Sequence, residues 1–552
     1  MRIRCTNVPD MIVHHAHVHV VDKTNSVEEA IAIEGNKVLA VGTNEEVLQL
    51  AGPQTKLVDA KGASVIPGIN DSHCHMWEAG MLMEGIMTFG IPSIKELAEE
   101  VGKRVAELKP GQWLQGGSWI ESQFIEGRMP TKHDLDPVSP DHPVVLERIF
   151  STCVANSAAL KAAGITKDTP DPKGGTIGRD EHGEPNGLLF RSAKQLVRDV
   201  MPSAFGEDKF GSGHQISAAI QRAQNEFLKY GITSVMEAGV TPSMIRAYQR
   251  LRKDNELKLR VNLMPSWHGF AINEDQDFSD RLIQEFGFSS GFGDEWLRIG
   301  SLKMAIDGGL TSKTSLRTWN YVGETEIKEF PLRLDLKNLD GWIKEAHDND
   351  WGTGIHVMGD VAVRKAAEAI YAAYKDNPKD LRHQLIHCYY IDEDVMLMMN
   401  EAKIIFAAQP AFIYNEADGY PKLLHEAQQK SFLPLRSALD AGVVVSMSSD
   451  IPSAHQNPFW GMYSAVTRKG MHGHSLGKEE AITVDEALHA MTHAGAYMSF
   501  EEEIKGTLEP GMLADLVILD HSLVDIDEEK IRDVLPVMTI VDGKIVYQKE
   551  RM

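Results

Sequence analysis

Apolar runs alternate with segments of helical spacing along most of this 552-residue chain. The short apolar runs predict β-strands at residues 65–76, 231–239, 257–266, 296–308, 352–360, 382–389, 403–410 and 443–450. Between them, apolar residues three and four positions apart predict helices, for example at residues 212–230, 335–349, 360–376 and 392–402. Eight strand and helix units in this order predict an α/β protein with a (β/α)8 barrel.

Both ends of the chain have a different pattern, in which short strands are joined by turns. Residues 1–64 alternate apolar and polar positions, and residues 505–552 contain two more strand-like runs with a turn at Asp542 and Gly543. We expect residues 1–64 and 505–552 to form one small β domain and residues 65–504 to form the barrel. The segment of about 77–230, which follows the first barrel strand, is expected to cover the mouth of the active site.

The charge and composition of the chain argue against several classes of binding partner. The chain has 56 Lys and Arg against 79 Asp and Glu, a formal net charge of −23, which opposes binding to nucleic acid or to anionic membrane surfaces. Its first residues lack the apolar core of a signal peptide, and no long apolar run is present. The 4 cysteines have no CxxC spacing, which argues against a disulfide framework or a thiolate zinc site. We expect a soluble, cytoplasmic protein with a small-molecule substrate, and homo-oligomers are a generic expectation.

Two groups of histidines follow strand periodicity. His73 and His75 flank Cys74 in the run VIPGINDSHCHM, so on one strand their side chains point to the same face, with Asp71 nearby as an acceptor or turn cap. This spacing alone is weak evidence for a metal site. The run of His14, His15, His17 and His19 also resembles a metal tract. We favour a structural role for that run, because no carboxylate or cysteine accompanies it in the sequence.

Polar residues are placed at the ends of several predicted barrel strands. Parallel barrel strands carry their chemistry at their carboxyl ends, so we expect these side chains to converge on one rim. The residues are His73 and His75 on the first strand, Lys303 on the fourth, His356 on the fifth, His387 on the sixth and Asp450 on the eighth.

Motifs spread through the chain resemble those of the amidohydrolase superfamily, in its amidohydrolase family 3 branch. The matching stretches include VIPGINDSHCHM, GSWIESQFIEGRMPTKHDLD, GITSVMEAG, SLKMAIDGGLTSKTS, HVMGD, RHQLIHC, SSDIPSAHQNP and GTLEPGMLADLVILD. The resemblance implies a barrel with a binuclear metal site, usually zinc, beside a β-sandwich made from both termini. It also implies that His73, His75 and Asp450 hold one metal ion, that His356 and His387 hold the other, and that Lys303 bridges them.

A bridging lysine requires a chemical change. An ammonium group has no lone pair and repels a cation, so Lys303 would act as a ligand only as a carbamate formed with carbon dioxide. The alternative is a salt bridge from Lys303 to Asp307 or to another barrel carboxylate.

The implied chemistry is hydrolysis of a carbon–nitrogen bond. Two metal ions that share one water lower its pKa from near 16 to about 7, which supplies hydroxide at neutral pH. Asp450 is expected to act as the general base and to pass the proton to the leaving nitrogen. The expected substrate contacts are Trp119, Arg317, Gln409, Arg468 and Asp307, although each has an ordinary structural alternative in burial, a salt bridge or support of a ligand.

The sequence leaves the reaction and the substrate open. The favoured function is a metal-dependent amidohydrolase that cleaves a non-peptide amide, formamide or N-acyl bond; the alternatives are an aminohydrolase (deaminase) or a decarboxylase on the same scaffold. A metal-free scaffold protein is the remote alternative, and the filled ligand positions oppose it. Ser151 and Glu237 depart from the residues common in the branch, histidine and aspartate respectively, which puts substrate choice in doubt.

Overall fold

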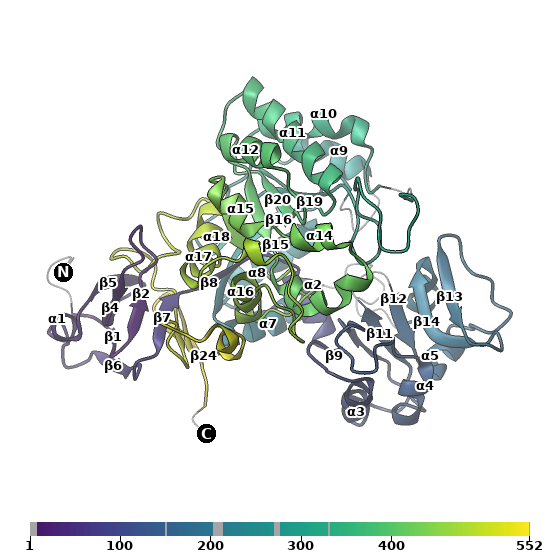
Figure 1. Cartoon of the computed structure of the whole chain (residues 1–552). Helices are drawn as coiled ribbons and strands as arrows, with labels where there is room; N and C mark the ends of the chain where they lie inside the picture. The colour runs from purple at the N-terminus through teal and green to yellow at the C-terminus, as the bar shows by residue number, and fades with distance from the viewer. Residues whose placement is uncertain are drawn as a thin grey trace. The chain divides into compact units, whose positions relative to one another are not determined.

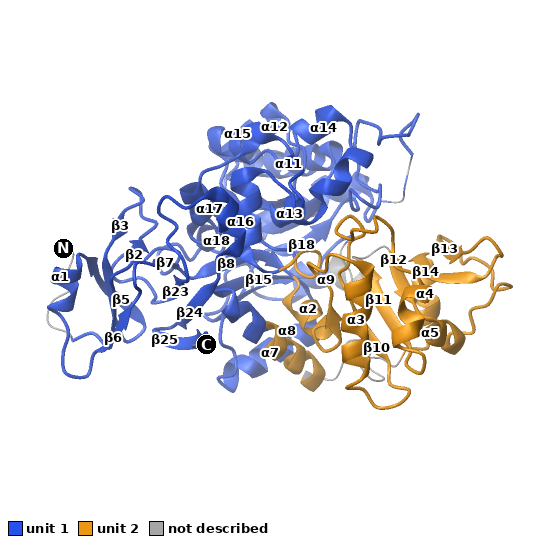
Figure 2. Ribbon diagram, turned by 60° about the horizontal axis from the view of Figure 1, so that its bottom comes forward, with its two compact units in different colours: residues 1–74, 224–450, 456–552 blue, residues 75–223, 451–455 orange. Residues whose placement is uncertain are grey.

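The computed structural model describes residues 8–148, 152–201, 213–269, 276–328, 330 and 332–550. The chain divides into two compact units, coloured separately in Figure 2. Unit 1 comprises residues 1–74, 224–450 and 456–552, and unit 2 comprises residues 75–223 and 451–455. Ser151, which departs from the family pattern, lies outside the described residues.

Parallel strands make up the middle of unit 1. One sheet has the order β17-β16-β15-β8 and another has the order β18-β19-β20-β21-β22. Their bounds are β8 Ile69–Cys74, β15 Ile232–Val240, β16 Arg260–Pro265, β17 Leu297–Ile299, β18 Leu302–Ala305, β19 Thr353–Val357, β20 Gln384–His387, β21 Ile405–Ala408 and β22 Val445–Met447. Each predicted strand range covers one of these strands, except that β15 runs one residue past its range of 231–239 and that residues 296–308 contain two strands, β17 and β18.

Backbone contacts join these two sheets at both sides. Ser266, just after β16, forms a parallel bridge with Lys303 of β18, and the Trp267 amide donates to the Lys303 carbonyl at 2.8 Å. On the other side, the Asp450 amide donates to the His73 carbonyl at 2.9 Å, so the segment after β22 is bonded to β8. The carboxyl ends of strands from both sheets are thereby held together.

Apart from β17 and β18, which follow each other directly, helices separate the parallel strands along the chain and lie around them in Figure 1. They are α7 Gly213–Lys229, α8 Pro242–Lys253, α9 Gln276–Glu285, α10 Leu339–Asp348, α11 Asp360–Asp376, α12 Glu393–Glu401, α13 Ala411–Glu416, α14 Glu426–Lys430, α15 Leu435–Asp440, α16 Pro458–Thr467, α17 Val484–Ala490 and α18 His493–Met498. In α11, Ala362, Ala366, Ile370 and Ala373 are buried at helical spacing. One apolar stripe of the helix therefore packs inward, as its sequence predicts.

Strands from the two ends of the chain share a sheet. One terminal sheet has the order β5-β4-β1-β6, and the other, β25-β24-β23-β7-β2-β3, contains strands from both ends. The bounds are β1 Met11–His14, β2 His17–His19, β3 Val27–Glu28, β4 Ala30–Glu34, β5 Lys37–Gly42, β6 Lys56–Asp59, β7 Ser64–Pro67, β23 Leu516–Leu519, β24 Pro536–Val541 and β25 Lys544–Gln548, with helix α1 Asn44–Leu48 before β6. Val13, Ile33, Val65, Leu516 and Ile540 belong to one apolar cluster, so the two terminal sheets share a core.

Unit 2 contains a mixed sheet of the order β13-β14-β12-β11-β10-β9. Its strands are β9 Ile86–Met87, β10 Leu114–Gly117, β11 Val144–Arg148, β12 Thr152–Ala155, β13 Gly175–Arg179 and β14 Pro185–Arg191, and its helices include α2 Met76–Leu82, α3 Ile94–Val105, α4 Lys132–Leu135, α5 Ser157–Ala162 and α6 Gln195–Arg198. Leu97 and Val101 of α3 pack with Leu114 and Trp119 in one buried cluster. Across the described residues, we find no helix with both the length and the apolar character needed to cross a membrane.

A buried ion pair connects the parallel sheet to the terminal sheet within unit 1. Arg260, the first residue of β16, donates from Nε to Asp515 Oδ2 at 2.6 Å and from Nη2 to Asp515 Oδ1 at 3.0 Å. The two side chains are 1% and 5% exposed. Asp515 also accepts from the Asp542 amide at 2.8 Å, next to the turn that joins β24 and β25. The pair therefore holds three segments of the fold in register.

Loss of Arg260 is expected to destabilise unit 1. Arg260→Met would leave Asp515 charged, buried and without its cation, which costs about 3–5 kcal/mol of unfolding free energy. Urea denaturation followed by tryptophan fluorescence measures this change. The matched control is Arg281→Met, which breaks the exposed pair with Glu285 and should cost under about 1 kcal/mol. Equal losses in the two variants would show that the buried pair does not support the fold.

Candidate metal centre

The carboxyl ends of the parallel strands bring buried polar side chains together in unit 1. His73 lies near the end of β8, Lys303 in β18, His356 near the end of β19 and His387 at the end of β20. His73, Lys303 and His387 are each 1% exposed, and Asp450 is 5% exposed. These positions follow from the strands themselves, since parallel strands carry their carboxyl ends at the same side.

The distances show a single cluster. Lys303 Nζ lies 3.2 Å from His73 Nε2, and the same His73 nitrogen lies 3.4 Å from Asp450 Oδ1. The ring centroids of His73 and His387 are 6.0 Å apart, and those of His356 and His387 are 4.5 Å apart, both in an edge-on arrangement. Lys303, Asp450 and the three histidines thus converge, although they come from five separate parts of the chain.

His75 has a different backbone setting from the one its sequence predicts. Strand β8 ends at Cys74, and His75 occupies the N-cap of α2 with φ −121° and ψ 67°. The expectation that His73 and His75 share one strand is therefore wrong. His75 is the first residue of unit 2, so its place in a metal site with His73 and Asp450 stays a prediction.

Two of these residues have an uncommon backbone conformation. Asp450 has φ 55° and His387 has φ 79°, in the left-handed region that residues with a Cβ rarely adopt. Such conformations cost energy and persist where surrounding contacts enforce them, often at functional sites. Asp71 of β8 supplies one such contact, because it accepts from the Ser449 amide at 3.0 Å, directly before Asp450. Asp71 thus has the supporting role that its sequence position predicts.

Burial controls the charge states within the cluster. Burial lowers the pKa of the Lys303 ammonium to about 7, against the opposing charge of Asp450. Burial also holds the pKa of His356 well below its ordinary value, and the neighbouring His387 adds to this effect. His356 is therefore neutral near pH 7 and keeps a lone pair on its ring, which a metal ion requires of an imidazole ligand.

Asp307 organises the loops behind His356. One of its oxygens accepts from the Met358 amide at 3.0 Å, and the other accepts from the amides of Gly359 at 3.0 Å and Leu316 at 2.8 Å. Its Oδ1 also lies 3.9 Å from His356 Nε2. Complete burial raises the pKa of Asp307 to about 7 despite these three hydrogen bonds. The geometry supports a role in loop position, whereas the expected substrate contact stays a prediction.

The other expected substrate contacts bind protein groups. Arg317 donates to Glu324 at 2.9 Å, and Arg468 donates to the carbonyls of Leu476 at 3.0 Å and Phe432 at 2.6 Å. The Trp119 indole, in unit 2, donates to the Leu146 carbonyl at 3.1 Å. Gln409, just after β21, donates to the Ala407 carbonyl and to Ser448 Oγ, both at 2.9 Å. The roles of these four residues toward a substrate stay predictions. Glu237, which stands where the family commonly has aspartate, is fully buried in β15, and its effect on substrate choice also stays a prediction.

A pocket that sequence reasoning missed lies beside the strand of Lys303. It has a volume of about 920 Å³ and is lined by His268, Gly269, Leu332, Arg333, Leu334, Asp335, Asn338 and Trp342. The Ala305 amide donates to the His268 carbonyl at 3.3 Å, and the Arg333 amide donates to the Ile306 carbonyl at 3.1 Å. A Cβ on Gly269 would lie 2.2 Å from the Ala305 carbonyl oxygen, so this approach requires glycine. The only sequence signal was His268, two residues beyond a predicted strand.

The donor set fits divalent metal ions. Imidazole nitrogens and a carboxylate are ordinary ligands of zinc and related ions, and these are buried and mutually close. Buried parallel strands with such a cluster at their carboxyl ends are the arrangement of a metal-dependent hydrolase of the α/β class.

Comparisons with known proteins agree with this class. A sequence profile of the amidohydrolase family matches residues 56–547, so the chain belongs to the amidohydrolase family, as its motifs indicated. It is 28% identical to an N-substituted formamide deformylase of Arthrobacter pascens over 99% of both chains. It also resembles a crystal structure of an uncharacterized metal-dependent hydrolase from Pyrococcus furiosus, with a TM-score of 0.69, 25% identity and coverage of 94% and 99% of the two chains.

A more distant likeness supports the fold alone. The crystal structure of the atrazine chlorohydrolase TrzN from Arthrobacter aurescens, complexed with zinc, is 14% identical, with a TM-score of 0.55 and coverage of 98% of this chain and 95% of that one. Together, the family match and these structures show a TIM-barrel-like α/β fold.

Substitution of Asp307 is expected to loosen the loops behind His356. In Asp307→Ala, three buried amides lose their acceptor, which should lower the free energy of unfolding by at least about 3 kcal/mol. Urea denaturation measures this loss. Asp180→Ala is a matched control, because Asp180 accepts from the amides of His182 and Glu184, both at 2.9 Å, in an exposed turn where water can replace it. A loss no larger than that of the control would contradict the role of Asp307.

Proposed function

We propose that the chain is a metal-dependent amidohydrolase that cleaves a non-peptide amide, formamide or N-acyl bond. The observation that carries this proposal is the buried cluster in which Lys303 Nζ and Asp450 Oδ1 lie 3.2 and 3.4 Å from the same His73 nitrogen. The full-length similarity to an N-substituted formamide deformylase supports a bond of this type as the one that is cleaved.

The proposal includes a fold in which eight strands close into one barrel. Strands β8, β15, β16, β18, β19, β20, β21 and β22 would form it, and the bonds from Trp267 to Lys303 and from Asp450 to His73 support closure on both sides. We assign residues 65–504 to this barrel domain, with a segment of about 77–230 inserted over its mouth. Residues 1–64 and 505–552 would form the β-sandwich, which the shared apolar cluster of the terminal sheets supports.

Two divalent cations are the proposed cofactors. His73, His75 and Asp450 would hold one, His356 and His387 the other, and Lys303 would bridge them as a carbamate. The position of Lys303 Nζ beside His73 supports a ligand role, which an unmodified ammonium group is unable to fill. Zinc is the proposed ion, since it binds imidazole and carboxylate ligands readily. When bound, such ions supply Lewis acidity that activates water and polarises a carbonyl group.

Side chains of the protein itself would carry out the proton transfer. Asp450 is held by the bond from its amide to the His73 carbonyl at 2.9 Å and by the Asp71 contact to the preceding residue. Its carboxylate would take a proton from the attacking water and deliver it to the nitrogen that leaves. Burial of the surrounding histidines would keep bulk water from competing for that proton.

Substitution of Asp450 should remove turnover more completely than it removes metal. In Asp450→Asn the general base is lost, so kcat for a responsive compound should fall at least about 100-fold. The assay is product release from a panel of N-formyl, N-acyl and cyclic amide compounds, with metal content measured by mass spectrometry on the same samples. Asp376→Asn, at a side chain that is 64% exposed, is the matched control and should retain wild-type turnover.

Several results would contradict the proposal. Retained turnover in Asp450→Asn would exclude Asp450 as the general base. Release of ammonia from a ring amidine without amide hydrolysis would indicate an aminohydrolase, and release of carbon dioxide would indicate a decarboxylase. Wild-type protein that binds no metal under any loading condition would indicate a scaffold without this chemistry.

A further inference from the structure

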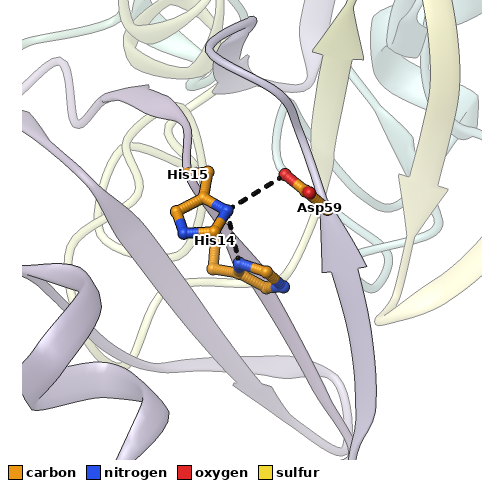
Figure 3. A group of neighbouring side chains, drawn as sticks. All are labelled: His14, His15 and Asp59. Carbon is orange, nitrogen blue, oxygen red and sulfur yellow. Dashed lines mark hydrogen bonds and ion pairs between the residues drawn. The ribbon is translucent and has the colours of Figure 1, made fainter.

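A second group of metal-ligand side chains lies on a terminal sheet of unit 1. His14, His15 and Asp59 each offer one ligand atom within 4.8 Å of the other two, and Figure 3 shows the three side chains facing one another. His15 Nδ1 lies 3.2 Å from His14 Nδ1 and 3.2 Å from Asp59 Oδ1. His15 and Asp59 are 56% and 48% exposed, so an ion from solution can reach them.

The backbone fixes this geometry without help from a ligand. Strands β1 and β6 pair in parallel with His14 opposite Asp59, so the register places the carboxylate beside the imidazole. His15 follows with φ 50°, a left-handed conformation that is uncommon for a residue with a Cβ. Its amide donates to Asn44 Oδ1 at 2.7 Å, and its carbonyl accepts from the Gly62 amide at 2.7 Å. The fold therefore directs the His15 side chain toward Asp59 at some cost in backbone strain.

We propose that His14, His15 and Asp59 form a surface binding site for a divalent transition metal ion such as zinc. Two imidazoles and one carboxylate are a donor set for zinc, nickel or copper rather than for calcium or magnesium. Three protein ligands leave a position open for water or for another donor. The site is distinct from the buried cluster, because it shares no residue with it. A bound ion would tie the end of β1 to the end of β6 in the terminal sheet.

The test compares zinc binding by wild type with binding by His15→Asn and Asp59→Asn. Asparagine tolerates the left-handed backbone at position 15, so the fold of the turn should be kept. Equilibrium dialysis against zinc, with metal measured by mass spectrometry, should give one equivalent less in each variant than in wild type. Zinc should also raise the melting temperature of metal-loaded wild type further than that of either variant.

His17→Ala is the matched control from the same histidine run. His17 Nδ1 bonds to Ser522 Oγ at 2.8 Å and belongs to no ligand group of the described residues. This variant should bind as many equivalents as wild type. If His15→Asn and Asp59→Asn both bind zinc with wild-type stoichiometry and affinity, the three residues form only an ion pair and the proposal is overturned.

A separate observation concerns the pocket beside Lys303. Arg333 lines it and is exposed. Among the residues that the structure describes its guanidinium has no hydrogen bond or ion pair, and the carboxylate whose charge acts on it is that of the buried Asp307. Two other lining residues, His268 and Trp342, have stacked rings with centroids 3.9 Å apart and an interplanar angle of 16°. The carboxylate that shares the pocket, Asp335, accepts from the Lys337 amide at 3.0 Å. An arginine is thus left available to a ligand.

We infer that Arg333 recognises a carboxylate on the substrate. This inference rests on the proposed function, since it names the residue that would bind a carboxylate group of the same amide substrate. The Arg333 amide is bonded to Ile306, three residues after Lys303, so the pocket opens beside the strand that carries the proposed bridging ligand. Guanidinium binds carboxylate in a bidentate manner, which gives orientation as well as affinity. The expected substrate class is therefore an N-acyl or N-formyl amine that carries a carboxylate.

Calorimetry with two probes tests this inference apart from catalysis. N-acetylglycine should bind wild type at least tenfold more tightly than N-acetylglycinamide, which has the same amide but no charge. Arg333→Met should remove this preference, and Arg281→Met, at an exposed surface pair, should keep it. Equal affinity of wild type for both probes, or an unchanged preference in Arg333→Met, would overturn the inference. An intact preference in a protein that hydrolyses no amide would support the role of Arg333 and contradict the proposed function.

Discussion

Burial of ionisable side chains at the strand ends is the constraint on which the rest of unit 1 depends. A charged group removed from water costs several kcal/mol unless partners satisfy it. Asp307 is paired with three backbone amides, and Asp71 is paired with the segment before Asp450. These contacts require the loops after β18, β19 and β22 to lie where they do. The chemistry of the cluster and the path of its loops are therefore set by the same hydrogen bonds.

The regular elements were predictable because their signal is local. Alternation of apolar runs and helical spacing depends on residues a few positions apart. The parallel strands of unit 1, apart from the last residue of β15, and the helices α10, α11 and α12 lie within the predicted ranges. The break between β17 and β18 was missed, since Gly300 and Ser301 fall inside residues 296–308, which the sequence pattern assigned to a single strand. The helical N-cap at His75 was missed because the alternate spacing of His73 and His75 fits a continued strand equally well.

Whether a site residue could be predicted from the sequence depended on whether it stands in a recognisable motif. His73, Lys303, His356, His387 and Asp450 stand in recognisable motifs, and the structure brings them together. Arg333 and Trp342 carry no motif, and only the backbone bond to Ile306 and the course of the chain place them near Lys303. The histidine run at residues 14–19 was given a structural role because its carboxylate partner, Asp59, is 44 positions from His15 and becomes a neighbour only through strand pairing.

The antiparallel pairing of β7 with β23 also affects how the protein is made. Leu516 lies 449 positions after Pro67, its partner in that pairing. At a translation rate of 5–20 residues per second, a ribosome needs roughly 20–90 s to make that intervening chain. Until then the nascent β7 has an open edge, which is a template for association with other polypeptides. Production of this protein should therefore depend on chaperones that shield the N-terminal strands during synthesis.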